Sequence, residues 1–363
     1  LDGSLSDSSR MVHHQSWPPG QSVNDFTRKD RHPPSHPPTH QTVTRVIIHM
    51  AVTNPGLNIY LAKRDCTAAF KRCFLQMGSI CWFASVVRGA LAGLKTAVML
   101  VWLTLTFGWT GSPGEYGVWP ALIDAAHNVT APPLPEVNGT EPFTAETYVD
   151  DGVLIEVDKG GRRERAAATY KEYLEGCLGE GAENLKKLAE EGAWEQTKIV
   201  WGIYYDLAKV AERGAAGGRL SLPQAKKQKA FMFTSQSWLD PGNRDVRRLD
   251  VQKLGGLVLY WSIVVYPLRL VLAAIFAMAG GPEKEFVSPV GNARERELRW
   301  REFDEATEFV RLIVQQRDNW EMTFTSPMAF ALSPKEILRM PGGWDHLWIG
   351  GDASGSEARM GDV

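Results

Sequence analysis

The stretch Thr147-Tyr148-Val149-Asp150-Asp151-Gly152-Val153-Leu154-Ile155 places two adjacent carboxylates between apolar flanks. The flanks, residues 143–148 and 153–157, are rich in β-branched and aromatic side chains and are typical of strands. Asp-Asp-Gly is typical of a tight turn, so the stretch predicts a β-hairpin with both carboxylates at its tip. Adjacent carboxylates repel each other, and a bound cation would neutralise them. A solvated turn is the alternative.

Length and composition indicate a sizeable core. The 363 residues are 44% hydrophobic, which suits two or three domains. A formal net charge of −2 gives no overall sign of nucleic-acid binding, so local charge has to carry any such inference. The chain begins at Leu1 and stops at Val363, and we expect a fragment of a larger polyprotein or a degraded copy of one. Its cysteines lack a C-x-x-C pair, which disfavours a zinc ribbon or disulfide framework and favours a reducing compartment: Cys66, Cys73, Cys81 and Cys177.

Residues 1–45 are polar and rich in Pro, His and Ser. We expect residues 1–20 to be disordered or truncated, and local order before residue 45 only over 22–29. The prolines between His32, His36 and His40 exclude a helix that could gather them around a metal, so solvated loop histidines are expected.

Another carboxylate follows a second predicted strand. Residues 44–52 are apolar and predict a helix that ends near Asn54-Pro55-Gly56, and residues 57–63 then alternate as a strand leading to Asp65. An Asp at a strand end points a carboxylate from a rigid edge into a cleft. Capping of the helix-like run that follows is the alternative role, and both can hold at once.

The order of elements predicts the fold. Residues 96–106 form an apolar arm, and the Gly- and Pro-rich loop 107–116 opens a helix. Residues 162–178 show helical spacing, and residues 198–206 return as a strand. From Asp65 onward the order is strand, helix, strand-turn-strand, helix, strand. This is the split β-α-β plan, an α+β fold with an antiparallel sheet and helices on one face.

Charge is segregated along the chain. Residues 141–197 hold 14 acidic and 7 basic residues, whereas residues 198–253 hold 11 basic and 5 acidic residues. A solvated face is the usual reason for such a run, but a basic segment after a carboxylate centre also suits a polyanion lying across the site. The basic segment includes Lys226, Lys227, Lys229, Arg244, Arg247 and Arg248.

Two-metal phosphoryl transfer needs carboxylates from separate strands around two Mg²⁺ ions roughly 3.5–4 Å apart. Asp65 and the Asp150-Asp151 pair can supply that arrangement on an antiparallel sheet. At these motifs, residues 20–280 resemble the reverse transcriptases of long-terminal-repeat and related retroelements. Tyr148-Val149-Asp150-Asp151 looks like the family's Y-x-D-D box, and residues 65–70 look like its D-x-x-x-A-[FY] motif.

The resemblance implies roles for these residues. Asp65, Asp150 and Asp151 are the implied catalytic and metal-binding carboxylates for two Mg²⁺ ions, or Mn²⁺ in their place, and Asp150 is expected to be the more direct ligand of the adjacent pair. The backbone of Cys66 would contact the metal-bound triphosphate. Phe70 falls where the family has the aromatic gate against a ribose 2′-hydroxyl, with an ordinary core aromatic as the alternative.

The resemblance also implies nucleotide and primer contacts. At the position of Phe107, retroviral members of the family carry Gln, whereas gypsy-like elements carry Phe. Phe107 therefore indicates the gypsy-like or tyrosine-recombinase branch. Residues 24–29 are similar to the fingers strand that ends in triphosphate-binding basic residues. The implied nucleotide-binding set is Phe70, Phe107, Gly108, Trp109, Pro113 and Tyr148, and the implied primer grip is Trp201, Gly202, Ile203 and Tyr204.

A right-hand polymerase arrangement is therefore expected. Residues 21–64 would be a partial fingers region, 65–205 the palm with fingers elements at about 71–100, and 206–345 the thumb and connection. Residues 346–363 look like the truncated start of a ribonuclease H domain, in which Asp352 would be a metal ligand of an incomplete site.

The function implied is RNA-directed DNA synthesis by a retrotransposon enzyme. Its partners would be an RNA template, a DNA primer and deoxynucleoside triphosphates, in the cytoplasm, the nucleus or virus-like particles. A group II or telomerase-like polymerase shares the carboxylates, and a catalytically inactive relic that only binds nucleic acid is the alternative from another class. The apolar run 254–279 admits a transmembrane helix, but Pro267 and Arg269 in its middle favour buried helices and no membrane partner.

Overall fold

A three-stranded antiparallel sheet carries the carboxylates that the sequence singles out. Its strand order is β1 (Ile59–Asp65), β5 (Asp151–Val157) and β4 (Ala145–Tyr148), so β5 lies in the middle. The pairing register places Asp65 directly opposite Asp151. The structure is a computed structural model that describes residues 15–87, 93, 95–280 and 284–324. The ribonuclease H-like segment with Asp352 and most of the N-terminal segment 1–20 lie outside the described residues.

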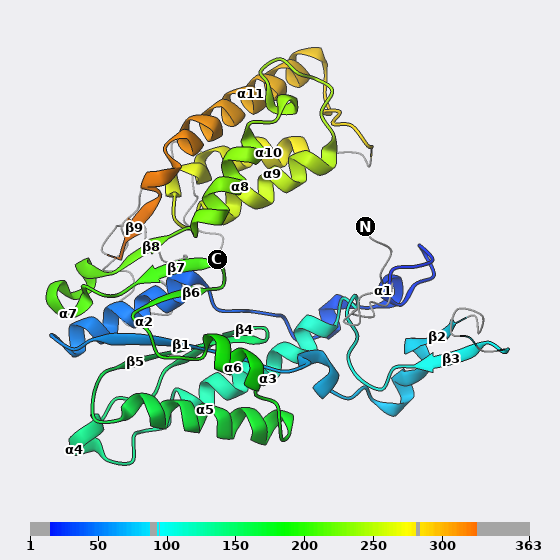
Figure 1. Ribbon diagram of the computed structural model, residues 1–363. Coiled ribbons are helices and arrows are strands. Elements are labelled where there is room, and N and C mark those ends of the chain that lie inside the picture. The colour runs from blue at the N-terminus through cyan, green and yellow to red at the C-terminus, as the bar shows by residue number, and fades with distance from the viewer. Residues whose placement is uncertain (1–14, 88–92, 94, 281–283, 325–363) are drawn as a thin grey trace, which may run out of the picture.

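The two faces of this sheet contribute to different cores. Because side chains alternate along a strand, Ala62 and Leu154 face α3 (Ser112–His127) and α5 (Arg162–Leu178). Leu61 and Val153 face the opposite core, to which α2 (His40–Thr53) contributes its buried stripe. Figure 1 shows α5 below the sheet and α2 above it. The predicted α+β class and antiparallel sheet are confirmed, but helices cover both faces and not one.

The last strand of the predicted split β-α-β plan belongs to a second, separate sheet. Its strands run in chain order as β6 (Thr197–Val200), β7 (Ile203–Asp206), β8 (Arg219–Ser221) and β9 (Glu321–Thr323). Residues 198–206 do not form the single strand that their pattern predicts. They form a hairpin of β6 and β7, which agrees with the resemblance of residues 198–204 to a primer-grip hairpin. Apart from its pairing with β5, β1 is joined by isolated bridges: Leu61 pairs with Glu195, and Cys66, directly after β1, pairs with Glu183.

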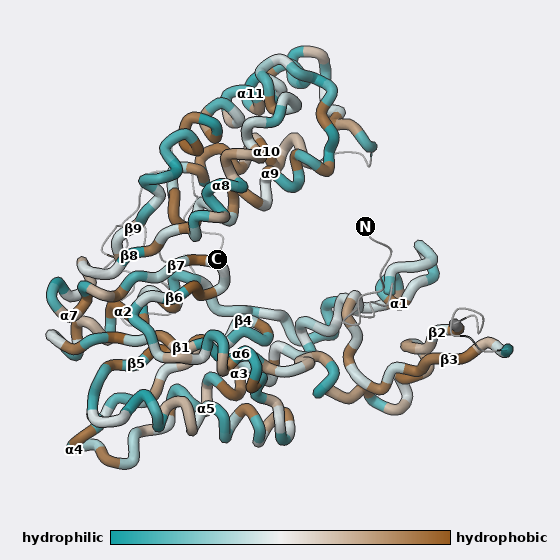
Figure 2. The backbone as a smooth tube through the Cα atoms, in the orientation of Figure 1, coloured by the Kyte–Doolittle hydropathy of each residue, from teal (hydrophilic) through white to brown (hydrophobic). Residues whose placement is uncertain are grey.

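The C-terminal half of the described chain is a helical unit. It contains α8 (Gln224–Thr234), α9 (Arg248–Trp261), α10 (Leu272–Ala279) and α11 (Ala293–Gln315). The short helix α7 (Val210–Arg213) lies apart from them, beside α2 (Figure 1). Figure 2 shows the apolar parts of α9 and α10 lying side by side. The apolar run 254–279 is interrupted by the 3-10 helix η7 (Tyr266–Val271). Within the described ranges, no helix combines the length and apolar character that crossing a bilayer requires.

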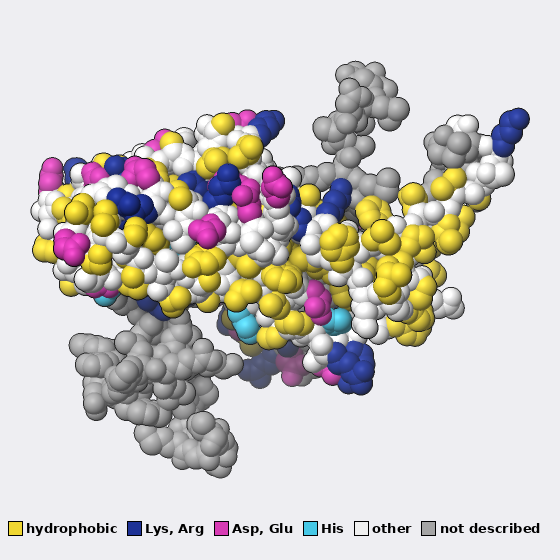
Figure 3. Space-filling view, turned by 90° about the horizontal axis from the view of Figure 1, so that it is seen from below, with side chains coloured by type: hydrophobic (Ala, Val, Ile, Leu, Met, Phe, Trp, Pro, Cys, Tyr) yellow, Lys and Arg dark blue, Asp and Glu magenta, His cyan; other side chains and the backbone are white. Residues whose placement is uncertain are grey.

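The N-terminal part lies beside a projecting hairpin of β2 (Ala84–Val87) and β3 (Val98–Val101) (Figure 1). The predicted fingers strand over residues 24–29 is wrong. Ser22 caps a short helix, α1 (Val23–Phe26), and exchanges hydrogen bonds with Asp25, which favours helical over extended backbone. Apolar side chains gather over the projecting arm in Figure 3; the most exposed include Phe74, Met77 and Val86.

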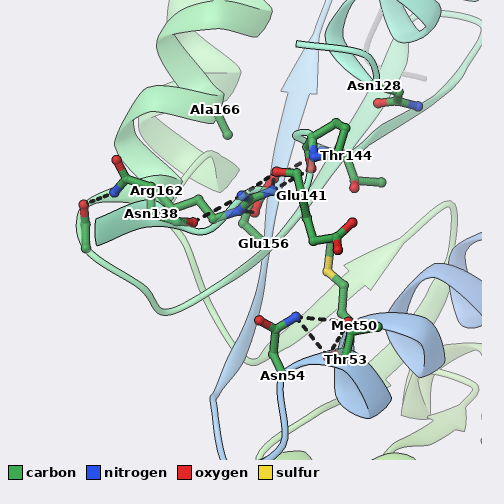
Figure 4. A network of polar contacts seen from close by, with 12 residues as sticks. Met50, Thr53, Asn54, Asn128, Asn138, Glu141, Thr144, Glu156, Arg162 and Ala166 are labelled. Carbon is green, nitrogen blue, oxygen red and sulfur yellow. Dashed lines mark hydrogen bonds and ion pairs between the residues drawn. The ribbon is translucent and has the colours of Figure 1, made fainter. Parts of the chain in front are cut away.

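A buried ion pair joins the far end of β5 to the start of α5. The Arg162 guanidinium contacts the Glu156 carboxylate, and both side chains are almost fully buried. Arg162 also donates to the backbone carbonyls of Asn138 and Glu141, at 3.2 and 2.6 Å, beside the short helix α4 (Pro135–Asn138). Glu156 accepts from the Thr144 backbone amide, so the pair fixes the segment that enters β4 (Figure 4).

Removing Arg162 is therefore expected to destabilise the fold strongly. Arg162→Met leaves the Glu156 carboxylate buried without its partner, and the free energy of unfolding should fall by about 3–5 kcal/mol. Urea denaturation measures this. Arg163→Met, which removes a partly exposed pair with Asp158, should cost no more than about 1 kcal/mol. If Arg162→Met lowers the free energy of unfolding no more than Arg163→Met does, the prediction is contradicted. Adding Glu156→Leu to the Arg162→Met chain should recover part of the lost stability.

Candidate functional site

Asp65 and Asp151 share one cation at the end of the β1–β5 pair. Asp65 is only 8% exposed, and its carboxylate accepts from the Asn184 side-chain amide at 2.7 Å and from the Lys187 ammonium. The same ammonium lies 3.5 Å from Asp151 Oδ1. Asn184 caps α6 (Leu185–Glu191), which carries Lys187 in its first turn. The hydrogen-bonded register and this helix together bring two acids and one base to one point.

The site holds more negative charge than its surroundings neutralise. The pKa of Asp151 is raised, first by burial and then by the neighbouring Asp150 and Asp65 carboxylates. The hydrogen bond to Asp65 raises the pKa of Lys187, and the charges of Asp151 and Asp150 act in the same direction. The arrangement therefore favours a cation between Asp65 and Asp151.

Asp150 is placed differently from the other two acids. Its backbone carbonyl accepts the Cys66 amide at 3.0 Å, so the predicted nucleotide contact of Cys66 cannot use that N–H in this arrangement. Asp151, and not Asp150, shares the Lys187 ammonium with Asp65. Among the described residues, no three His, Cys, Asp or Glu side chains are grouped so as to hold one metal ion. Asp65 and Asp151 fit a cation, because an ammonium already lies against both.

The turn of the carboxylate hairpin lies one residue earlier than predicted. Tyr148 pairs with Asp151, so the turn consists of Val149 and Asp150, and Val149 adopts a positive φ of 57°. Gly152 is a strand residue. A Cβ at this position would lie 2.6 Å from the Tyr170 hydroxyl, so close packing, and not turn geometry, requires glycine here.

The predicted capping role of Asp65 is wrong, since the short 3-10 helix after it, η2 (Ala69–Arg72), has no side-chain cap. Asn184 and Lys187 are site residues that sequence reasoning missed. An N-cap signature at Asn184 is readable in the sequence and places Lys187 in the first helical turn. Nothing local to that helix indicates that it packs beside Asp65.

The aromatic residues predicted to contact a nucleotide lie beyond Asp65. The Phe70 ring lies 5.0 Å from that of Phe107 and 5.4 Å from that of Tyr116, measured between centroids. Phe107 is 42% exposed, so one side of the group is open to solvent. Pro113 lies in the first turn of α3 and sets the direction of that helix.

Helix α1 holds the loop that follows Phe107. Asn24 donates to the Gly108 carbonyl at 2.8 Å and accepts from the Thr110 amide. The Trp109 indole N–H donates to the Thr27 hydroxyl at 2.8 Å. The predicted loop residues Gly108 and Trp109 are therefore attached to the N-terminal segment and not directly to the carboxylates.

The hairpin of β6 and β7 docks on the carboxylate hairpin. Trp201 and Gly202 form its turn, both with positive φ, and the Trp201 indole N–H donates to the Asp151 carbonyl at 2.9 Å. The Tyr148 and Trp201 rings lie 5.6 Å apart. Of the other predicted primer-grip residues, Ile203 is fully buried, whereas Tyr204 is partly exposed.

A cavity of about 440 Å³ opens where the two hairpins meet the helical unit. The Tyr260 hydroxyl donates to the Gly202 carbonyl at 2.6 Å, which ties α9 to the β6–β7 turn. The Lys226 ammonium lies over the Tyr260 ring. The cavity combines aromatic side chains with one guanidinium; its lining includes Tyr148, Trp201, Tyr260, Tyr266 and Arg269.

Two expectations about charged side chains are wrong. His40 is not a solvated loop residue: it starts α2, its ring contacts the Tyr205 hydroxyl, and burial lowers its pKa to about 4. The basic segment is not one solvated face either. Lys227 is buried and donates to the Asp318 carbonyl, and Arg244 pairs with Asp304, whereas Lys226 is exposed.

Comparison with known proteins gives low similarity. The chain is similar to a foamy viral protease-reverse transcriptase dRH in complex with double-stranded DNA, with 14% identity and a TM-score of 0.44. The match covers 84% of this chain and 41% of that chain. For a foamy viral protease-reverse transcriptase in complex with an RNA/DNA hybrid, the identity is 14% and the TM-score 0.39, over 80% of this chain and 31% of that one. No family model and no curated protein matches. At this similarity the function has to be inferred from the chain's own residues.

Close packing at Gly152 gives a first test of the site's architecture. Gly152→Ala should lower the free energy of unfolding by about 1–3 kcal/mol, because the new methyl group and the Tyr170 hydroxyl cannot both fit. Tyr170→Phe removes that oxygen. In the Tyr170→Phe background the same glycine change should cost clearly less, and equal costs in both backgrounds would contradict the packing argument. Chemical denaturation of the four chains measures the difference.

Two acids, Asp124 of α3 and Glu146 of β4, predict a dependence of stability on pH. Asp124 accepts the backbone N–H and the hydroxyl of Thr147, both at 2.7 Å. Burial raises the pKa of Asp124 to about 6 and that of Glu146 to about 7, and the Asp124 charge adds to the latter. An acid with a raised pKa binds its proton more tightly in the folded state. Its contribution to stability is therefore present at low pH and is lost as the pH rises.

For Glu146 this loss should extend from about pH 4.5 to pH 7 and amount to about 1–3 kcal/mol. Glu146→Gln should remove that part of the decline, whereas Glu141→Gln, at an exposed position, should leave it in place. Unfolding free energies measured at several pH values test this. Parallel profiles for the wild type and Glu146→Gln would show that Glu146 is not the group responsible.

Proposed function

We propose that the chain is an RNA-directed DNA polymerase of a retroelement that adds deoxynucleotides to the 3′-end of a primer. The observation that carries the proposal is the direct pairing of Asp65 with Asp151, with a cation held between their carboxylates. The resemblance of residues 65–70 and 148–151 to the polymerase motifs agrees with this pairing.

Asp65, Asp150 and Asp151 would hold two Mg²⁺ ions. When bound, the ions would lower the pKa of the primer hydroxyl and hold the triphosphate. The chain's own part is to keep the carboxylates in place. The β1–β5 register fixes Asp65 and Asp151, and the bond from Cys66 to the Asp150 carbonyl fixes the turn. Such preorganisation avoids reorganisation of the charged groups during reaction.

The incoming nucleotide would bind beside the aromatic group beyond Asp65. Phe70 is held by Phe107 and Tyr116, so its ring has little freedom to move away from a sugar placed against it. In this position it would exclude a ribose 2′-hydroxyl, and Phe107 would contact the base through its exposed side.

The end of the primer would lie at the cavity between the hairpins and the helical unit. Tyr148 and Trp201 offer apolar surface next to the carboxylates, and Arg269 supplies a positive charge for a phosphate. Lys226, exposed over Tyr260, extends this charge along α8.

In this proposal, the palm consists of the three-stranded sheet with α3 and α5, and it includes all of β1, which the sequence divides between fingers and palm at residue 65. The fingers consist of the segment around α1 together with the β2–β3 arm, and the thumb consists of α8 to α11. Asp352 would belong to a ribonuclease H domain.

Primer extension on an RNA template tests the function. With Mg²⁺ and deoxynucleotides the purified chain should extend the primer, and EDTA or Asp150→Asn should abolish extension because two-metal transfer needs every carboxylate. Asp158→Asn is the matched control, since Asp158 follows the opposite end of β5 and pairs with Arg163 at the surface. Extension by Asp150→Asn at the control rate would overturn the proposal. Binding of the primer–template without extension in the wild type would favour the inactive, nucleic-acid-binding relic.

A further inference from the structure

The Lys187 ammonium lies between the carboxylates of the two paired acids. Its ammonium contacts Asp65 and lies 3.5 Å from Asp151 Oδ1, so one side chain is shared by carboxylates from two strands. Asn184, from the same helix, occupies the other oxygen of Asp65 at 2.7 Å. Helix α6 thus supplies both partners of the Asp65 carboxylate.

The neighbouring cations of β1 are held by other acids. Lys63 contacts Glu191, and Arg64 lies 3.3 Å from Glu183 in a buried pair. Asp65 is almost fully buried, and an unpaired carboxylate there would be costly. Lys187 is therefore the cation that offsets part of the negative charge of Asp65 and Asp151.

The Lys187 ammonium can move away from the two carboxylates. Its side chain is 44% exposed, whereas that of Asp65 is 7% exposed, so the ammonium reaches the acids from the solvent side. A lysine stem is flexible and its ammonium is readily hydrated, so it can withdraw without disturbing the cores on either face of the sheet. The acids, in contrast, are fixed by strand pairing.

We propose that Lys187 is a resident counter-ion that competes with a divalent metal for Asp65 and Asp151 and is released when the metal binds. This proposal rests on the proposed function in one respect: the proposed function is the reason that the competing cation is taken to be a divalent metal ion. Two consequences follow: removal of the ammonium strengthens metal binding, and metal binding frees the ammonium.

The first consequence is measured as Mn²⁺ binding to the full chain, from the electron paramagnetic resonance signal of free Mn²⁺ and without nucleotide or primer. Lys187→Met should bind Mn²⁺ roughly tenfold more tightly than the wild type, because a positive charge a few ångströms from the ion is removed. Lys186→Met is the matched control: it makes the same change in net charge, one residue away, at an exposed position. Its affinity should equal that of the wild type.

Equal affinities for Lys187→Met and Lys186→Met would overturn the proposal, and so would weaker binding by Lys187→Met. The absence of Mn²⁺ binding in all three chains would overturn it too. Circular dichroism in EDTA checks that each variant is folded.

The second consequence, release of the ammonium on metal binding, is measured on the wild-type chain. It therefore tests the proposal even if Lys187→Met does not fold. Acetylation of the wild-type chain by acetic anhydride, followed by mass spectrometry, gives the rates at Lys187 and Lys186. Mg²⁺ should raise the Lys187 rate several-fold relative to Lys186, and an unchanged ratio would overturn the proposal. Since neither measurement uses primer extension, a chain that releases Lys187 but does not extend a primer would refute the proposed function alone.

Discussion

The pairing of β1 with β5 is the constraint on which the rest of this structure depends. Each strand contributes a carboxylate, and the antiparallel register sets Asp65 opposite Asp151. A shift of one residue would move every side chain of β1 to the other face and would separate the acids. The register is held because both faces are buried: Leu61 and Val153 belong to one core, and Ala62 and Leu154 to the other.

The electrostatics of the centre follow from that geometry. Acids at paired strand ends cannot separate, so their repulsion has to be offset by a partner. Here α6 provides an ammonium and an amide to Asp65, and the β6–β7 turn closes over the other side through the bond from Trp201 to the Asp151 carbonyl. The centre is therefore flanked by elements that follow the carboxylate hairpin in the chain.

The same elements shape the surface around the centre. Tyr260 joins α9 to the Gly202 carbonyl, so the helical unit and the hairpins border one cavity with aromatic walls. At the other end of the sheet the Glu156–Arg162 pair fixes the entry to β4. The carboxylate hairpin is thus held at its tip by polar contacts and at its base by a buried ion pair.

Local pattern was enough to determine the strands around Asp65 and Asp150, the helices over residues 162–178 and around 44–52, and the antiparallel α+β class. Apolar periodicity and turn residues report these features directly. The position of the turn was off by one residue, because Gly152 is required by its contact with Tyr170, a residue distant in the sequence. The extended reading of residues 24–29 failed because the Ser22 cap outweighs a weak motif match.

The sequence by itself therefore determined which residues carry the acids and which strands present them. Only the tertiary structure decided which two acids share a cation, that Lys187 and Asn184 supply their partners, and that Lys227 is buried and His40 half-buried against Tyr205. The physical reason is distance along the chain. Strand and helix preferences act over a few neighbouring residues, whereas Lys187 reaches Asp65 only because α6 packs against a strand that ends 122 residues earlier.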